Sequence, residues 1–142
     1  MLKSDLKNKK VTKKFLKKII AQNQDDLRII SALCSGALVN QSKIKYLKQN
    51  KVFLIPLERK NKETGNSNEK IFSILKFEFI EQSKSKNINL EKKELFLELI
   101  AIDTFKKKEN FEIVILFLNN TAITLTSEVV EVTLEDMTEI ND

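Results

Sequence analysis

Only one segment of this 142-residue chain has the periodicity of a helix, and most of the chain after it follows strand patterns. Its apolar residues repeat at helical spacing and form one face, which consists of Leu27, Ile30, Cys34 and Leu38. Asn23 and Asp25 are suited to cap the first turn, where Asp26 also fits the helix dipole. Gly36 suits the left-handed residue that ends a helix. The pattern therefore predicts a helix over residues 25–35.

The remaining apolar residues fall into runs that predict strands. These runs cover residues 15–21, 43–48, 51–57, 71–79, 95–104 and 111–118, and a final strand starts at Ala122 and changes apolar phase, as at a β-bulge, near Val129. Parallel strands need recurring crossover helices, and this chain offers one helix. The sequence therefore predicts an α+β fold that is mainly antiparallel β. We expect about seven strands as a curled sheet or partly open barrel, with the helix near the N-terminus closing one side.

Local signals add detail to this prediction. Residues 49–50 and 119–120 fit tight hairpin turns, since Asn tolerates positive φ. Pro56 lacks an N–H, so its end of the strand is predicted to be an edge or a bulge. Polar composition predicts connections over residues 59–70 and 81–93.

Positive charge is concentrated at the start of the chain. Residues 1–24 hold eight lysines and one acid, which gives +7, whereas the rest holds 17 basic and 19 acidic residues, which gives −2. We therefore expect residues 1–13 to be a flexible lysine-rich tail and residues 14–142 to be a single, near-neutral α+β domain. Three interpretations of the tail stay open. It is solvated without a partner, it makes weak non-specific contact with RNA or another polyanion, or it lies on an anionic membrane through Leu6, Val11, Phe15 and Ile19.

The residue inventory excludes several kinds of active site. The chain has no histidine, which removes the usual general base near neutral pH, the commonest metal ligand and every His-dependent triad. Two isolated glycines cannot form a phosphate loop, and one Tyr without any Trp disfavours a platform for stacking bases. The single cysteine, Cys34, excludes an internal disulfide and lies on the apolar helical face, so we expect a buried structural thiol. No catalytic, cofactor-binding or metal-binding residue is predicted.

Charged pairs in the sequence have simpler explanations than catalysis. Glu58 and Arg59, at the end of a predicted strand, are interpreted as an exposed ion pair. Glu135 and Asp136 are interpreted as solvated side chains of a polar C-terminal stretch. The longest apolar run, residues 113–118, is far too short to span a membrane. The first residues lack a secretion signal, so we expect a cytoplasmic protein with no transmembrane segment.

Four segments resemble a known family: DDLRIISAL at residues 25–33, IKYLKQNKVFLIPLER at 44–59, ELFLELIAIDTF at 94–105 and FEIVILFLNNTAITLTSEVVEVTLEDM at 111–137. Over residues 15–137 the chain is similar to the uncharacterised alphaproteobacterial family known as domain of unknown function 2948. The resemblance implies a small cytoplasmic bacterial protein with no established activity, cofactor or partner. The chain departs from two runs of that family. Residues 33–36 replace a His-Leu-Gln-Asp-like run, and only Arg59 remains of an Asn-Arg-Phe-x-Trp-like run.

A complete β fold without catalytic groups predicts a non-catalytic cytoplasmic interaction or binding domain, with an unknown protein as its partner. The alternative is a binder of a small apolar or lipid-like ligand within the curled sheet, because strands that are apolar on both faces can line a cavity. The remaining hypotheses are an enzyme that uses only carboxylates and lysines, and nucleic-acid binding through the lysine-rich tail.

Overall fold

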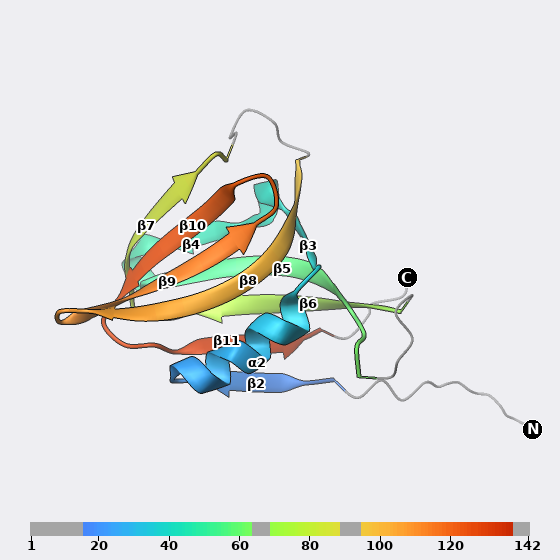
Figure 1. Cartoon of the computed structure of the whole chain (residues 1–142), viewed down its shortest axis with the longest axis horizontal. Coiled ribbons are helices and arrows are strands. Elements are labelled where there is room, and N and C mark those ends of the chain that lie inside the picture. Colours follow the sequence, from blue (N-terminus) through green and yellow to red (C-terminus); the bar gives the residue numbers. More distant parts are fainter. Residues whose placement is uncertain (1–15, 64–68, 89–94, 138–142) are drawn as a thin grey trace, which may run out of the picture.

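The computed structural model describes residues 16–63, 69–88 and 95–137, so the predicted tail lies outside the described residues. Within these ranges the chain forms one α-helix and ten strands (Figure 1). Their order is β2 (Lys18–Ala21), α2 (Gln24–Cys34), β3 (Leu38–Asn40), β4 (Lys45–Leu47), β5 (Val52–Lys60), β6 (Lys70–Phe77), β7 (Ile80–Lys86), β8 (Phe96–Lys107), β9 (Asn110–Phe117), β10 (Thr121–Ser127) and β11 (Val132–Asp136). Two 3-10 turns, η1 (Gln41–Lys43) and η2 (Lys48–Asn50), flank β4.

All strands belong to one bent antiparallel sheet. The strand order is β2-β11-β6-β5-β3-β8-β9-β10-β7, and β4 pairs with the start of β5. The described ladders do not close this sheet into a barrel, although the Tyr46 hydroxyl on β4 donates to the Ile80 carbonyl on β7 at 2.9 Å. The predicted mainly antiparallel α+β class is confirmed. The strand count is higher than expected because β3 and β7 were not predicted and the last predicted strand is two strands.

Helix α2 lies between β8 and the β2 edge of the bent sheet and packs against β8, β2 and β5 (Figure 1). The Asn23 side chain accepts a hydrogen bond from the Asp26 N–H at 2.8 Å, which confirms the predicted N-cap. Gly36 has φ +88°, so it is the predicted left-handed residue, and the helix ends just before it. Leu38 therefore does not extend the helical face. It lies in β3, and its side chain is 40% exposed on the outside of the sheet.

The predicted turns are present, with one refinement. Asn119 and Asn120 have φ values of 65° and 57° and connect β9 to β10, as expected for a tight hairpin. The β4–β5 hairpin is also confirmed, but Lys51, rather than either predicted turn residue, takes the left-handed conformation. Pro56 lies in an interior strand. On one side of β5, β4 pairs with residues up to Leu54 and β3 pairs with Glu58. Pro56 lies in the gap between these two ladders, where its missing N–H is not needed.

Two predicted connections are shorter than expected, and the predicted bulge near Val129 corresponds to a register shift that lies slightly earlier in the chain. Strand β5 continues to Lys60 and β6 begins at Lys70, and residues 80–86 form β7 despite their polar composition. Strand β7 is an edge strand that pairs with β10 alone, so it needs no apolar alternation. Val129 lies in the connection from β10 to β11. The apolar phase changes across this connection, and just before it the β10–β7 ladder shifts its register between Thr126 and Ser127, as at a bulge.

Alternation along the strands separates a packed inner face from an exposed outer face. The inner face joins the helix in one continuous core, whose fully buried members include Leu27, Ile30, Ile55, Leu75, Phe77, Ile113, Ile115, Leu125, Val132 and Leu134. Positions in the opposite phase of β5, β6, β3 and β8 point outward. They include several apolar side chains that nothing in the described part of the chain covers, such as Phe72 and Phe96.

Candidate functional site

An ionic network lies buried on the inner side of the sheet and ties β5, β6 and β11 together. The Arg59 Nε and Nη2 atoms donate to the two carboxylate oxygens of Asp136 at 3.1 and 2.8 Å, and both side chains are 0% exposed. The Ser73 hydroxyl and the Lys17 backbone N–H donate to the same carboxylate at 2.6 and 3.0 Å. Arg59 also donates to both carboxylate oxygens of Glu63, at 3.1 and 3.3 Å.

This arrangement corrects two interpretations made from the sequence. Arg59 does not form an exposed ion pair with Glu58, because adjacent strand residues face opposite sides of the sheet. Glu58 lies on the outer face and pairs with Lys70 at 3.7 Å. Asp136 is buried, whereas its neighbour Glu135 is exposed as expected.

Hydrogen bonding sets the charge state of the network. Burial alone would raise the pKa of Asp136, but the hydrogen bonds from Arg59, Ser73 and the Lys17 N–H outweigh it and lower that pKa. Burial likewise opposes the charge of Arg59, and the bonds to Asp136 and Glu63 raise its pKa in spite of it. The pair is therefore ionised near neutral pH.

Every donor of the Arg59 guanidinium is used, because its Nη1 atom also reaches the Lys60 carbonyl at 3.5 Å. Each carboxylate oxygen of Asp136 accepts two hydrogen bonds. A carboxylate held in this way has little capacity left to accept a proton from a substrate. The network is suited to holding strands together.

Cys34 lies close to this network at the end of α2. Its thiol is fully buried, as predicted, and burial raises its pKa to about 12. Nearby, the Lys62 ammonium donates to the Ala32 and Ser35 carbonyls at 2.7 and 2.9 Å. The last turn of α2 contains no basic residue of its own, so Lys62 supplies the cation that favours the helix C-terminus.

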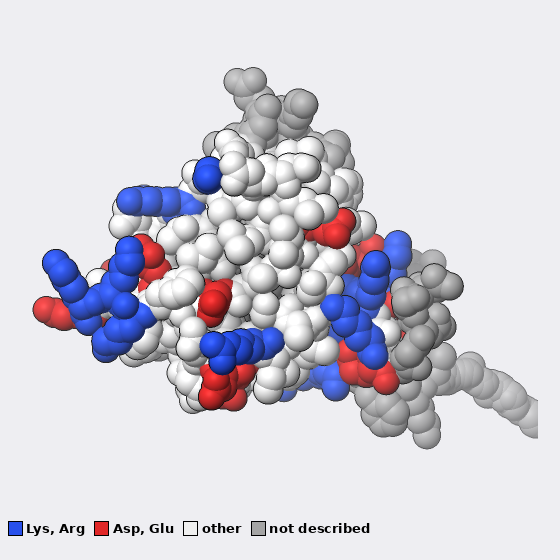
Figure 2. Space-filling model, viewed as in Figure 1, with Lys and Arg blue, Asp and Glu red and all other residues white. Residues whose placement is uncertain are grey.

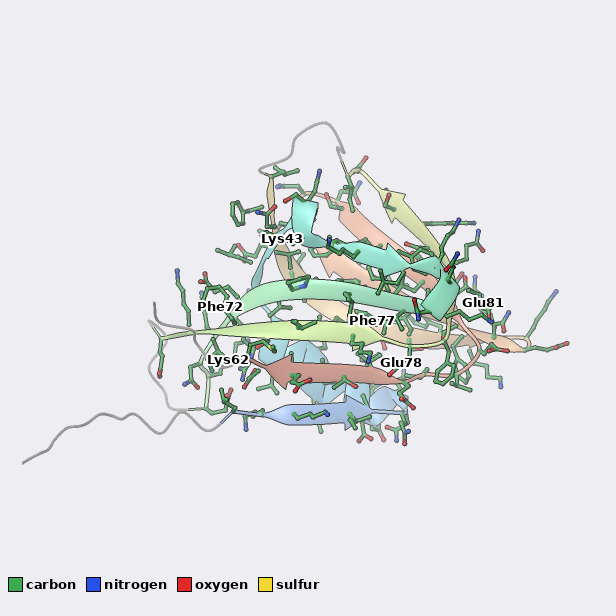
Figure 3. All side chains as sticks on the ribbon, turned by 180° about the vertical axis from the view of Figure 1, so that it is seen from behind. Lys43, Lys62, Phe72, Phe77, Glu78 and Glu81 are labelled. Atoms are coloured by element: carbon green, nitrogen blue, oxygen red, sulfur yellow. The ribbon has the colours of Figure 1, made fainter. Side chains whose placement is uncertain are left out.

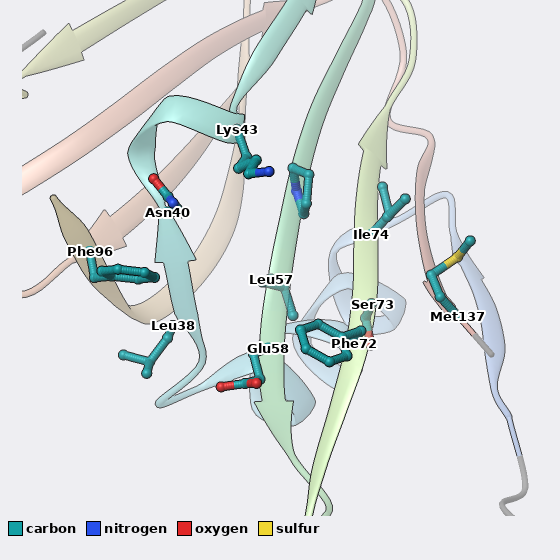
Figure 4. A pocket seen from close by; sticks show the side chains of 11 residues that line it. Leu38, Asn40, Lys43, Leu57, Glu58, Phe72, Ser73, Ile74, Phe96 and Met137 are labelled. Carbon is teal, nitrogen blue, oxygen red and sulfur yellow. The ribbon is translucent and has the colours of Figure 1, made fainter. Parts of the chain in front are cut away.

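A hollow of about 390 Å³ lies on the outer face of the sheet, over β5 between β3 and β6 (Figure 4). We call it the outer hollow, and it is lined by Leu38, Asn40, Lys43, Pro56, Leu57, Glu58, Phe72, Ser73, Ile74, Phe96 and Met137. Phe72 and Phe96 stand on opposite sides of it, and Glu58 and Lys43 stand at its two ends (Figure 4). The two rings are 51% and 57% exposed. Figure 3 views the molecule from behind and shows Phe72 on β6 and Lys43 where η1 leads into β4.

Apolar surface continues beyond the outer hollow. A second hollow of about 370 Å³ shares Leu38 and Phe96 with it and extends to Leu118, in the turn that follows β9. Leu38, Leu118 and Met137 are each 40–43% exposed. Single exposed apolar residues are ordinary on protein surfaces, but contiguous ones mark interaction sites.

Other surfaces of the described residues carry weaker signals. Figure 2 shows lysines and acids intermixed at the ends of the opposite face, with a mostly uncharged middle.

Among the described residues no three His, Cys, Asp or Glu side chains gather as they would around a metal ion. No helix within the described ranges has the length and apolar content needed to cross a membrane. Ile19 lies in β2 opposite Leu134, so it belongs to the sheet, while Leu6, Val11 and Phe15 of the suggested membrane-contacting segment lie outside the described residues.

The sequence held a signal for the buried network that the interpretation missed. Arg59 shares the strand phase of Phe53, Ile55 and Leu57, and Asp136 shares that of Val132 and Leu134. Both charged residues thus fell on the predicted inner face. By contrast, the outer hollow combines residues from β3, β5, β6 and β8, which are far apart in the sequence. No local sequence pattern predicts that these residues come together.

Comparison with known proteins identifies one related family. The family described as "Protein of unknown function (DUF2948)" matches residues 17–141. No curated protein and no solved structure gives a significant match. The family match spans nearly the whole chain and leaves out only residues 1–16, which include the lysine-rich tail, and the last residue. The chain therefore belongs to the DUF2948 family.

Proposed function

We propose that this chain is a non-catalytic interaction domain of the cytoplasm whose outer hollow binds an apolar surface of a protein partner. One observation carries the proposal: Phe72 and Phe96, both more than half exposed, flank an apolar hollow that none of the described residues covers. Aromatic side chains in exposed apolar patches are typical of binding surfaces. The single reduced cysteine supports a reducing compartment.

The chemistry of the buried groups supports a non-catalytic role. Arg59 and Asp136 are saturated by hydrogen bonds within the protein, and the Cys34 thiol is buried and has a raised pKa. A nucleophilic thiol needs the opposite, a lowered pKa and access to solvent. The candidate groups therefore stabilise the fold instead of facing a substrate.

A second candidate function is the binding of a small apolar or lipid-like molecule. The volume of the outer hollow, about 390 Å³, falls within the usual range of ligand pockets. That hollow lies on the outside of the sheet, whereas the inner side chains of the bent sheet pack against one another and against α2. Titration with a fluorescent fatty acid distinguishes the candidates, because saturable binding that is lost in Phe72→Ser favours the ligand.

Site-specific photo-cross-linking in the native host tests the proposed function. A photoreactive amino acid replaces Phe72, Phe96 or, as a matched control, Phe105, which is 48% exposed on the same strand as Phe96. Phe105 lies about 30 Å further along that strand. We expect protein adducts from positions 72 and 96 and none from position 105. Equal labelling from all three positions, or none from any, would contradict the proposal.

A further inference from the structure

We infer that the partner of the outer hollow is a second copy of this chain, and that the two copies pack face to face as a two-fold symmetric dimer. The inference rests on the proposed function, since it names the occupant of the same surface. It starts from the arrangement of charge around the hollow, which is self-complementary.

The outer hollow has one acid and one base at opposite ends. Glu58 on β5 lies at one end, and Lys43 at the end of η1 lies at the other (Figure 4). Among the residues that the structure describes, Lys43 forms no ion pair, and Glu58 pairs only with the exposed Lys70, at 3.7 Å. Exposed pairs of this kind are weak, so Glu58 is available to a better-placed cation.

Two-fold symmetry brings these charges together. In a face-to-face dimer the axis lies in the plane of the interface, and each patch meets the same patch on the other copy. When the axis crosses the outer hollow at right angles to β5, it exchanges the two ends. Glu58 of each copy then meets Lys43 of the other, so one dimer contains two such ion pairs. Phe96 lies beside this axis and meets its counterpart, while Phe72 faces the Ile74 end of the other copy (Figure 4).

The apolar surface is adequate for such an interface. Leu38, Phe72, Phe96 and Met137 are 40–57% exposed around the hollow, and Leu118 extends the patch to the turn after β9. An apolar centre with charges at its rim is the usual anatomy of a homodimer interface. A lipid or an unrelated protein can also use apolar surface, but neither has a reason to match an acid and a base related by a two-fold axis.

Sedimentation equilibrium of the full chain tests this inference with charge reversals. Glu58→Lys alone or Lys43→Glu alone places like charges at both contacts, so each is expected to weaken dimerisation at least about tenfold. The double variant recreates both pairs with exchanged signs, and we expect its dissociation constant to return to within about threefold of the original. Far-UV circular dichroism and thermal unfolding of each variant confirm that it is folded.

Phe96→Ser and Phe105→Ser form a second, charge-independent arm. We expect Phe96→Ser to weaken the dimer at least about tenfold, because both copies lose a central contact, and Phe105→Ser to leave it unchanged. The inference would be overturned by a chain that stays monomeric at about 100 μM. It would also be overturned by a double charge variant that dimerises no more tightly than the single variants. If that monomeric chain still gives adducts with a different protein from positions 72 and 96 in the host, the proposed function stands and only the dimer is wrong.

Discussion

Replacing Asp136 by Asn removes one charge from the buried network and leaves the shape of the side chain nearly unchanged. Both carboxylate oxygens of Asp136 accept hydrogen bonds, from Arg59, Ser73 and the Lys17 N–H. An Asn amide offers one oxygen and one NH₂ group, so a donor now faces a donor at one of the two positions. Arg59 keeps only Glu63 as an ionic partner, and the Glu63 side chain is 26% exposed.

The expected cost is large because the Arg59 and Asp136 side chains are 0% exposed. Breaking a buried ion pair by removing one partner costs about 3–5 kcal/mol in the free energy of unfolding. Since Glu63 still neutralises part of the guanidinium charge, we expect the lower end, about 3 kcal/mol. In a domain of this size that loss lowers the melting temperature by roughly 10 °C.

The pH dependence gives this prediction a sign. Because the folded pKa of Asp136 is lowered, its contribution to stability is fully present above the unfolded pKa of about 3.9 and is lost as the pH falls through the folded value. The difference in stability between the original chain and Asp136→Asn should therefore be constant from about pH 7 to pH 5 and shrink below about pH 4.

Urea unfolding followed by circular dichroism measures both quantities. Glu135→Gln is the matched control, since it removes the neighbouring charge from an exposed side chain and should change stability by less than about 0.5 kcal/mol. An Asp136→Asn cost below about 1 kcal/mol, or a cost that grows as the pH falls, would refute the reasoning.

Three further predictions concern other parts of the chain. Cys34 should react slowly with a thiol reagent near neutral pH and fully only after denaturation. Cys34→Ala should lower the free energy of unfolding by about 1 kcal/mol, and Cys34→Asp should lower it much more because it buries an unpaired charge. Lys62→Met should lower stability by about 0.3–1 kcal/mol in urea unfolding, and Lys62→Arg by less, because the helix C-terminus loses its cation. Deleting residues 1–12 should leave the melting temperature nearly unchanged and abolish any salt-sensitive retention on heparin; a drop of about 5 °C would contradict this.

Local chemistry made the helix and the tight turns predictable. The Asn23 cap, the positive φ of Gly36 and the Asn119–Asn120 turn each depend on neighbours a few residues away. The type of fold followed by elimination, because one helix cannot connect parallel strands. These features depend on interactions within a short stretch of chain, and the sequence displays such stretches directly.

Long-range pairing was not predictable from the same patterns. Arg59 and Asp136 are 77 residues apart, and each alone in a polar stretch resembles a solvated charge. Strand β7 has polar side chains because its stability comes from the backbone ladder with β10, which leaves no trace in an apolar pattern. In both cases the deciding partner lies far away in the sequence.

A strand with apolar residues on both faces is not always buried on both faces, and the outer face of this sheet is an example. The inner residues of β8, such as Leu97 and Leu99, are buried in the core, yet Phe96 on the same strand is 57% exposed. Phe72 on β6 repeats this pattern beside buried Ile71 and Ser73. An exposed ring gives the folded chain little stability and adds a risk of aggregation. The packing of the described residues therefore does not account for these two rings, and the interaction surface proposed above offers a reason for them.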